Sequence, residues 1–377
     1  MMRNKVTVDG FLTKFMYICP INRINTTTIM NTKNRIRYLI PAGACFLTII
    51  VLTYYYFFSA FSASTTTQYI LVDTDDTADS LYAKMQPFAS RHGLHAFHTL
   101  AQHSAFENNI QTGRYEVQPG MSTFQLYRKM KGGLQTPLNL TIPSVRTITA
   151  LSEELGRKLM VDAHEWEEAL QNPDTCAHYG YTPETIVCLF IPNTYAIYWN
   201  TSVSRLLNRM QKESKTFWND TRLAKAKQLN LSPEEVITLA SIVDEETANN
   251  SEKPMIAGMY YNRLNFRDAE YPKGMPLQAD PTIKFALGDF SLKRIYHNML
   301  KTDSPYNTYT HAGLPPGPIR IPSVAGIDAV LNLVHHNYLY MCAKEDFSGT
   351  HNFAATYKEH LANAARYSKA LNSRGIK

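Results

Sequence analysis

Residues 232–247 read SPEEVITLASIVDEET, and this stretch predicts the helix around which we interpret the rest of the chain. Ser232 is a good N-cap residue, Pro233 suits the first helical position, and Glu235 completes a capping box. The apolar residues that follow recur at helical spacing. We therefore expect a helix with one buried face that ends in a run of acidic residues.

The three acidic residues at the end of this helix point in different directions. At 100° per residue from Val243, Asp244 falls at about 100°, Glu245 at about 200° and Glu246 at about −60°. Glu246 therefore lies within the apolar stripe, Asp244 at its rim, and Glu245 on the opposite face. Burial raises the pKa of a carboxyl group, which suits a general acid at neutral pH. The alternatives for Glu246 are an acid at a fraying helix end or a buried ion-pair partner.

The length and charge of the chain limit its class. With 377 residues, of which 44% are hydrophobic, the chain can form two or three packed domains. The net charge is +6. Residues 1–37 hold seven basic residues and one acidic residue, so this leader carries the whole excess and the remainder is neutral. A body that binds nucleic acid would have its own basic patch, so we expect no nucleic-acid partner.

An uncharged run follows the basic leader at residues 38–60. As a helix it would be roughly 34 Å long, enough to cross the hydrocarbon core of a membrane. The positive-inside rule places residues 1–37 in the cytoplasm and the body outside, anchored in the inner membrane by a single pass. The alternative is a signal peptide cleaved near Ala63. A start at Met30 would shorten the leader without changing the topology.

The cysteines and histidines do not form a metal-binding pattern. The chain has five cysteines and contains neither CxxC nor HExxH, so we expect no metal and no cofactor. Cys176 and Cys188 lie outside the predicted membrane span, where both a disulfide and two free thiols are compatible with the sequence.

The pattern of hydrophobic residues predicts an α+β fold. Strands are expected at 68–71, 114–117 and 138–142, and helices at 77–88 and 122–130. These elements predict a small module over residues 61–140. Beyond it the pattern is more helical and predicts a second domain over residues 141–377, with helices at 149–160, 165–171 and 203–227.

A series of short motifs runs in order from Gly113 towards the C-terminus. They are Gly113–Tyr115, Phe190–Tyr195, Ala240–Thr247, Asn262–Leu264, Met275–Thr282, Ser304–Tyr309, Gly313–Ile319 and His351–Phe353 with His360. Together they resemble the MltG/YceG-like family of endolytic murein transglycosylases. The chain departs from the family pattern at Val117, which replaces an aromatic residue, at Asn193, which replaces an aspartate, at Asp244, which replaces a glutamate, and at Ser323.

The resemblance implies a function for the residues in these motifs. The second glutamate of the ASIVDEET motif is the family's catalytic acid, and that position is Glu246. The family analogy also implies cleavage of nascent peptidoglycan strands with 1,6-anhydro ends, a LysM-like glycan-binding module at residues 61–140, and penicillin-binding synthases as partners. Predicted substrate contacts, chosen because their side chains suit sugar binding, are Gln278, Asn307, Tyr309, Tyr306 and Asn193.

Other interpretations remain open. A muramidase would use water together with a second carboxylate, either Asp280 or Asp244. We interpret Asp280 as a helix cap rather than as that carboxylate. A non-catalytic glycan-binding scaffold is a further alternative. A cytosolic pyridoxal-phosphate lyase is disfavoured by the predicted anchor and by the absence of lysine from the motif around Glu246.

Overall fold

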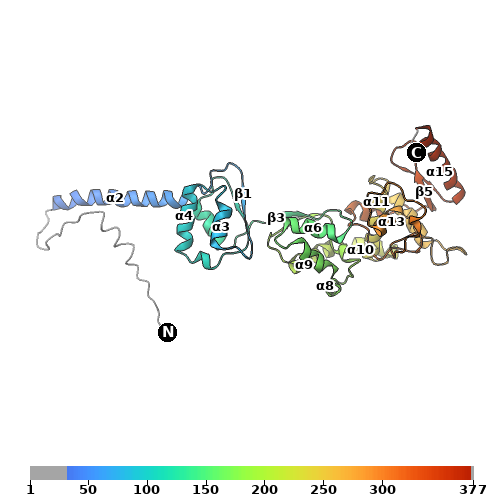
Figure 1. The fold of residues 1–377 in the computed structure, drawn as a ribbon, viewed down its shortest axis with the longest axis horizontal. Helices are drawn as coiled ribbons and strands as arrows, with labels where there is room; N and C mark the ends of the chain where they lie inside the picture. Colours follow the sequence, from blue (N-terminus) through green and yellow to red (C-terminus); the bar gives the residue numbers. More distant parts are fainter. Residues whose placement is uncertain (1–31, 375–377) are drawn as a thin grey trace.

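The computed structural model describes residues 32–374 of the chain. The first part of the predicted leader, including the alternative start at Met30, lies outside the described residues. Helix α2 leads into an N-terminal module, which a short extended segment joins to the larger C-terminal body (Figure 1). In the described residues, many helices combine with short strands that form three two-stranded antiparallel sheets, so the expected α+β class is confirmed.

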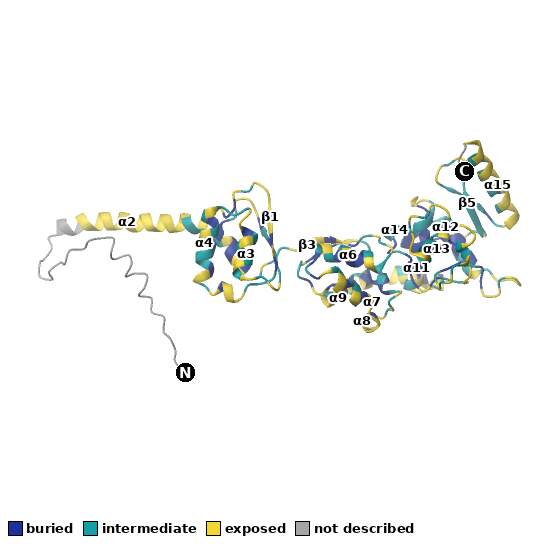
Figure 2. Cartoon of the chain, viewed as in Figure 1, coloured by how far each residue is buried: buried dark blue, intermediate teal, exposed yellow. Residues whose placement is uncertain are grey.

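Helix α2 spans Thr32–Phe58. Its segment Arg37–Phe58 is long and apolar enough to cross a membrane, and it is exposed along almost its whole length (Figure 2). The last turn instead contacts the N-terminal module. The Tyr56 hydroxyl lies 3.3 Å from Thr99 Oγ1, and the ring of Phe58 lies 5.1 Å from that of Phe124. These aromatic residues therefore attach the helix to the folded body.

The N-terminal module has its own hydrophobic core, formed around Phe61, Phe97, Tyr115 and Leu126. Its strands β1 and β2 are antiparallel, with Ile70 opposite Tyr115. The elements in order are β1 Gln68–Val72, α3 Ala78–Met85, α4 Arg91–Gln102, the 3-10 helix η1 Phe106–Asn108, β2 Gly113–Val117 and α5 Thr123–Lys131. Helix α4 was not predicted from the sequence, and α3 ends three residues before its predicted boundary.

A second core forms around Trp166 in the middle of the chain. Its elements are β3 Leu138–Thr141, α6 Ile148–Lys158, α7 Ala163–Gln171, α8 Pro173–His178, η2 Ile186–Leu189, β4 Thr194–Ile197 and α9 Val203–Phe217. Helix α10, Asp220–Gln228, follows them, and its buried residue Ala226 belongs to the core of the C-terminal part. The single helix predicted over residues 203–227 is wrong. The chain leaves the helix at Trp218, and the side chain of Asn219 accepts a hydrogen bond from the Arg222 N–H to start α10.

Cys176 and Cys188 are both free and buried. Cys176 belongs to the middle core, whereas Cys188 belongs to the core of the C-terminal part. The alternative of a disulfide between them is therefore wrong for this structure.

Helix α11, Pro233–Glu246, is the centre of the third core. Every residue from Val236 to Val243 is buried, because helices α12, α13 and α14 all contact α11. The predicted capping box is present: Ser232 Oγ accepts from the Glu235 N–H, and Glu235 Oε2 accepts from the Ser232 N–H. The remaining elements are α12 Lys253–Asn265, α13 Asp280–Leu287, η3 Met299–Lys301, α14 Val324–Leu331, β5 Tyr340–Ala343, β6 His351–Ala354 and α15 Tyr357–Ser373.

Asp244 is more deeply buried than its predicted rim position. Its carboxylate pairs with Lys253 Nζ at 2.8 Å, and the two side chains are only 5% and 7% exposed. Asp244 Oδ2 also accepts a hydrogen bond from the Ser323 N–H at 2.5 Å. Asp244 thus joins α11 to the start of α12 and to the N-terminus of α14.

We expect Asp244→Asn to destabilise the protein by about 3–5 kcal/mol, because it leaves Lys253 as an unpaired buried charge. The measurement is the free energy of unfolding in urea, made on the full chain in detergent. The matched control is Glu213→Gln, which breaks the exposed pair between Arg209 and Glu213 and should cost less than about 1 kcal/mol. Equal effects of the two substitutions would contradict the assigned role of Asp244.

Candidate active site

Glu246 is the last residue of α11, and its side chain lines a polar cavity of about 230 Å³. The walls of this cavity come from segments that lie far apart in the sequence. The other lining residues are Met259, Tyr260, Arg263, Gln278, Asp280, Tyr309, Met341, Cys342, Ala343 and His351. The cavity therefore combines two carboxylates with an arginine, a histidine and two tyrosines.

The surroundings of Glu246 favour its protonated form. Burial raises the pKa of the Glu246 carboxyl, and the nearby Asp280 raises it further. The Tyr260 hydroxyl opposes this shift by donating to Glu246 Oε1 at 2.6 Å, and His351 and Arg263 also lower the pKa. The net direction is upward, as the helical-wheel analysis predicts. The C-terminal end of α11 adds to the effect, because the helix dipole disfavours a negative charge there.

Tyr260 and Arg263 are site residues to which the sequence analysis gave no role. They lie three residues apart on α12 and both line the cavity. Burial raises the pKa of the Tyr260 hydroxyl, so Tyr260 remains a hydrogen-bond donor to Glu246. Arg263 donates from Nε to the Leu339 carbonyl at 2.6 Å and from one terminal nitrogen to the Leu277 carbonyl at 2.5 Å. Their shared helical face was the signal that could have identified them.

The hairpin of β5 and β6 forms the wall that carries His351. Glu252 Oε1 accepts from the His351 backbone N–H at 2.6 Å, and Glu252 Oε2 lies 3.1 Å from His351 Nδ1. On α12, Asn262 donates its amide to the carbonyls of His336 and Tyr338, just before β5. These contacts attach the hairpin to the helix that carries Tyr260.

Asp280 and Tyr309 are neighbours in the wall of the cavity. The Tyr309 hydroxyl donates to Asp280 Oδ1 at 2.5 Å, and burial together with this contact raises the pKa of Tyr309. The expectation that Asp280 caps a helix is wrong. Ala279 occupies the N-cap of α13 and Asp280 is the first helical residue, so its side chain points towards the cavity instead of the helix backbone.

Gln278 lines the cavity with an exposed side chain and an uncommon backbone conformation. Its φ is +50°, and its N–H donates to the Thr308 carbonyl at 2.9 Å. Left-handed backbone at a residue with a side chain is uncommon and costs free energy, so the surrounding structure must hold it in place. The geometry directs the Gln278 amide into the cavity that Glu246 lines.

The structure places Asn307 beneath the site rather than on its surface. Asn307 is fully buried, and its amide donates to the carbonyls of Leu300 and Thr302 at 3.0 and 2.8 Å. Its Oδ1 accepts from the Tyr309 N–H at 2.9 Å. The predicted contact with substrate does not fit this position, because the amide is already bonded within the loop. Asn307 instead holds the backbone of Tyr309.

Two other predicted contacts also lie outside the cavity. The centre of the Tyr306 ring lies 4.7 Å from that of Phe285, with the two rings tilted by 45°, and Tyr306 packs against the C-terminal core. Asn193 precedes β4, where its Oδ1 accepts from the Thr194 N–H at 2.8 Å. The prediction that they contact substrate beside Glu246 does not fit, since one side chain is used in packing and the other in a local turn. Of the predicted residues, Glu246, Gln278 and Tyr309 share the cavity.

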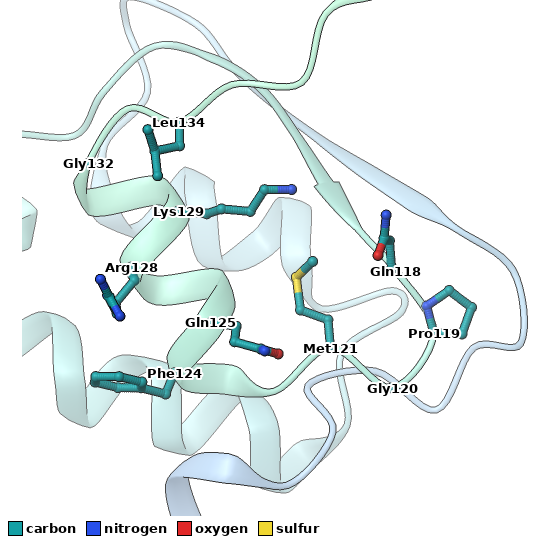
Figure 3. Close-up of a pocket in the computed structure, with 10 residues that line it drawn as sticks. All are labelled: Gln118, Pro119, Gly120, Met121, Phe124, Gln125, Arg128, Lys129, Gly132 and Leu134. Carbon is teal, nitrogen blue, oxygen red and sulfur yellow. The ribbon is translucent and has the colours of Figure 1, made fainter.

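A larger cavity of about 690 Å³ lies in the N-terminal module, along α5 (Figure 3). Its lining includes the amides of Gln118 and Gln125, the apolar side chains of Met121 and Phe124, and the cations Arg128 and Lys129. No carboxylate lines this cavity among the described residues. Its chemistry therefore suits binding and not acid/base catalysis. The Glu246 cavity is the candidate active site because it holds a carboxyl of raised pKa among hydrogen-bonding side chains.

Comparison with known proteins relates most of the chain to one family. A model of the YceG-like family matches residues 70–366. The endolytic murein transglycosylase of Bacillus subtilis (strain 168) is 28% identical over 283 residues, which cover 71% of this chain and 76% of the relative. The endolytic murein transglycosylase of Streptococcus pneumoniae serotype 2 is 28% identical over 311 residues. The match covers 74% of this chain and 54% of the relative. A crystal structure of a putative YceG-like protein from Listeria monocytogenes is similar to this chain, with a TM-score of 0.50 and 26% sequence identity. The matched region covers 79% of this chain and 99% of the Listeria chain.

We expect Glu246→Gln to stabilise the protein at pH 7–8 by roughly 0.5–2 kcal/mol, as substitutions at strained functional sites often do. A carboxyl whose pKa is raised by folding binds its proton more tightly in the native state. Its ionisation therefore destabilises the native state as the pH rises above the unfolded pKa of about 4.3. Thermal unfolding of the full chain at pH 4 and at pH 8 measures this difference, which should shrink at pH 4.

The matched control for this experiment is Glu245→Gln. Glu245 pairs with Arg146 at 2.7 Å and with Arg320 at 2.9 Å, so its loss should destabilise the protein at pH 8. The assigned environment of Glu246 is contradicted when Glu246→Gln lowers stability equally at both pH values.

Proposed function

This chain belongs to the YceG-like family, and we propose that it is an endolytic murein transglycosylase, a lyase of peptidoglycan, in which Glu246 is the acid/base. The observation that supports this most is a carboxyl group of raised pKa in a polar cavity that is otherwise lined by hydrogen-bonding side chains. Tyr260 binds one oxygen of Glu246. The other oxygen is the one that exchanges a proton with the substrate.

The chemistry needs a single acid/base and no water. Glu246 gives its proton to the glycosidic oxygen between N-acetylmuramic acid and N-acetylglucosamine, and the bond from that oxygen to C1 breaks. The N-acetyl carbonyl assists at C1. The C6 hydroxyl of the same muramic acid then attacks C1, and its proton passes to the Glu246 carboxylate. The products are a 1,6-anhydro end and a free hydroxyl on the leaving sugar, and Glu246 is again protonated. An attacking group in the same sugar has a large effective concentration.

Gln278 and Tyr309 are the proposed substrate contacts. The Gln278 amide offers both a donor and an acceptor at the cavity surface, where sugar hydroxyls and N-acetyl groups need both. The Tyr309 ring offers a face for a sugar, and its hydroxyl is held by Asp280. Asn307 acts through Tyr309, since it fixes the Tyr309 backbone and has no free polar atom for the substrate.

A muramidase is the second candidate, because Asp280 lines the same cavity as Glu246. Glycosidases that hydrolyse with water usually use two carboxylates, one as the general acid and one as the base or nucleophile. Asp244 is not available for this role, since it is buried against Lys253. The product ends distinguish the two reactions, because hydrolysis leaves reducing ends.

The rest of the proposal concerns the place of the enzyme in the cell. The apolar helix Arg37–Phe58 is the proposed single-pass anchor in the inner membrane, with the basic leader 1–37 in the cytoplasm and the span at 38–60. Residues 61–140 form the proposed LysM-like glycan-binding module, in which the cavity along α5 is the candidate surface. Residues 141–377 form the proposed catalytic domain. The enzyme acts on nascent strands made by penicillin-binding synthases and terminates their elongation.

We expect the full chain in detergent to convert purified glycan strands into fragments with 1,6-anhydromuramic acid ends, identified by mass spectrometry. Glu246→Gln should reduce the initial rate by roughly 10²–10⁴-fold, because the amide has no proton to transfer. Glu213→Gln, which removes the charge of a carboxylate that pairs with Arg209 on α9, is the control of similar charge change. Reducing ends in place of anhydro ends would favour the muramidase, and full activity of Glu246→Gln would contradict catalysis by Glu246.

We expect two substitutions to shift the pH profile of kcat/KM in opposite directions. Activity falls as the pH rises through the pKa of Glu246, because the acid must start protonated. Tyr260→Phe removes the hydrogen bond that lowers this pKa, so the alkaline limb should move to higher pH. Asp280→Asn removes the charge that raises it, so the limb should move to lower pH.

The control for the pH profile is Tyr261→Phe. The Tyr261 hydroxyl donates to the Leu229 carbonyl on the other side of α12 and should leave the limb in place. Shifts of Tyr260→Phe and Asp280→Asn in the same direction would show that Glu246 does not set the alkaline limb.

A further inference from the structure

A small second cavity lies beside the candidate active site. It has a volume of about 30 Å³, which is the size of one carboxylate group or water molecule. Its lining residues are Arg146, Glu245, Pro281, Lys284, Phe290 and Ile319. Glu245 and Pro281 adjoin Glu246 and Asp280 in the chain, so the two cavities share the end of α11 and the start of α13.

This second cavity is positively charged, whereas the catalytic cavity holds two carboxylates. Arg146 binds Glu245 with two hydrogen bonds of 2.7 and 3.0 Å, and Arg320 adds a third at 2.9 Å. One carboxylate thus faces two guanidinium groups, and Lys284 adds a further positive charge to the lining. The cluster keeps a surplus of two positive charges next to the site of bond cleavage.

Lys284 differs from the two arginines of this cluster because no acidic residue of the described chain pairs with it. Its side chain is half-buried on α13, yet within residues 32–374 it forms no ion pair and no side-chain hydrogen bond. The acid nearest to it in the sequence, Asp280, lies one turn earlier on α13 and accepts a hydrogen bond from the Tyr309 hydroxyl instead. Asp289 accepts its hydrogen bonds from Ser291. A partly desolvated ammonium without a counter-ion favours binding of an external anion.

The Arg146 side chain is exposed enough to contribute to such binding. It is 42% exposed, and its guanidinium carbon lies 5.1 Å from the centre of the Phe290 ring. The Phe290 face and the pairing with Glu245 hold the guanidinium in one orientation. Arg146, which is held in one orientation, and Lys284 therefore both line a cavity with room for a carboxylate group.

We propose that Arg146 and Lys284 bind a carboxylate of the peptide stem carried by the muramic acid that is cleaved. This inference rests on the proposed function, because it takes the substrate to be peptidoglycan. The stem is attached through the lactyl group at C3 of the same sugar whose C1 must face Glu246, so it leaves the catalytic cavity next to the reacting bond. Peptide stems carry free carboxylates, and the positive cavity is the neighbouring surface that complements them. The enzyme therefore distinguishes strands with stems from bare glycan.

The test compares strands that carry peptide stems with strands from which an amidase has removed them. The full chain in detergent should cleave the stem-bearing strands with the higher kcat/KM. Lys284→Gln should lower kcat/KM on stem-bearing strands by roughly tenfold, the size of one charge-assisted hydrogen bond, and leave cleavage of bare strands unchanged. Lys284→Arg, which keeps the charge, should restore most of the preference.

Lys369→Gln, an exposed position on α15, is the matched control for the loss of one positive charge. The inference is overturned when Lys284→Gln leaves the preference intact or slows both substrates equally while the unfolding midpoint is unchanged. It is also overturned when the parent chain cleaves both substrates equally well, although the proposed function then stands. Failure of the parent chain to cleave either substrate overturns the proposed function and this inference together.

Discussion

The structure depends on how one helix end accommodates three adjacent carboxylates. Helix α11 is buried on most sides, and the dipole at its C-terminus disfavours negative charge. Each carboxylate has a different partner: Asp244 has Lys253 in the core, Glu245 has two arginines, and Glu246 has the hydroxyl of Tyr260. Glu246 alone of the three lacks a direct ion pair, and burial raises its pKa. The ion pairs of Asp244 and Glu245 direct those two carboxylates away from the catalytic cavity, which only Glu246 of the three lines.

The same arrangement builds the cavity from distant parts of the chain. Lys253 starts α12, so its pairing with Asp244 sets where Tyr260 lies relative to Glu246, two turns further along that helix. Gly258 lets α12 approach the segment before β5, because a Cβ there would lie 2.2 Å from the Val334 carbonyl oxygen. Glu252 then binds His351 in the hairpin. The buried pair, the close approach and this contact together place the last wall of the site.

The sequence predicted those parts of the fold and site that depend on local periodicity. The capping box of α11, its buried face and the inward direction of Glu246 all follow from residues within four positions of one another. The break between α9 and α10 was missed, because a side-chain cap at Asn219 outweighs continuous helical propensity. The internal roles of Asn307 and Tyr306 could not be predicted from the sequence either. The type of a side chain indicates which hydrogen bonds and contacts it can form, but not whether other parts of the protein already occupy them.

Negative and positive charges are separated around the end of α11. Glu246 faces a cavity that also holds the Asp280 carboxylate, whereas Glu245 faces two arginines. Glu245 is half-buried, so its negative charge must be balanced by cations. Arg146 and Arg320 together carry one positive charge more than this balance requires. The surplus is held beside the catalytic cavity and not in it, because Arg146 and Arg320 both bind Glu245 and neither lines the cavity of Glu246. A substrate that is neutral at the bond to be cleaved and anionic beside it matches both halves of this surface. The acid run at the end of α11 therefore organises two neighbouring environments, one that holds a proton and one that suits an anion.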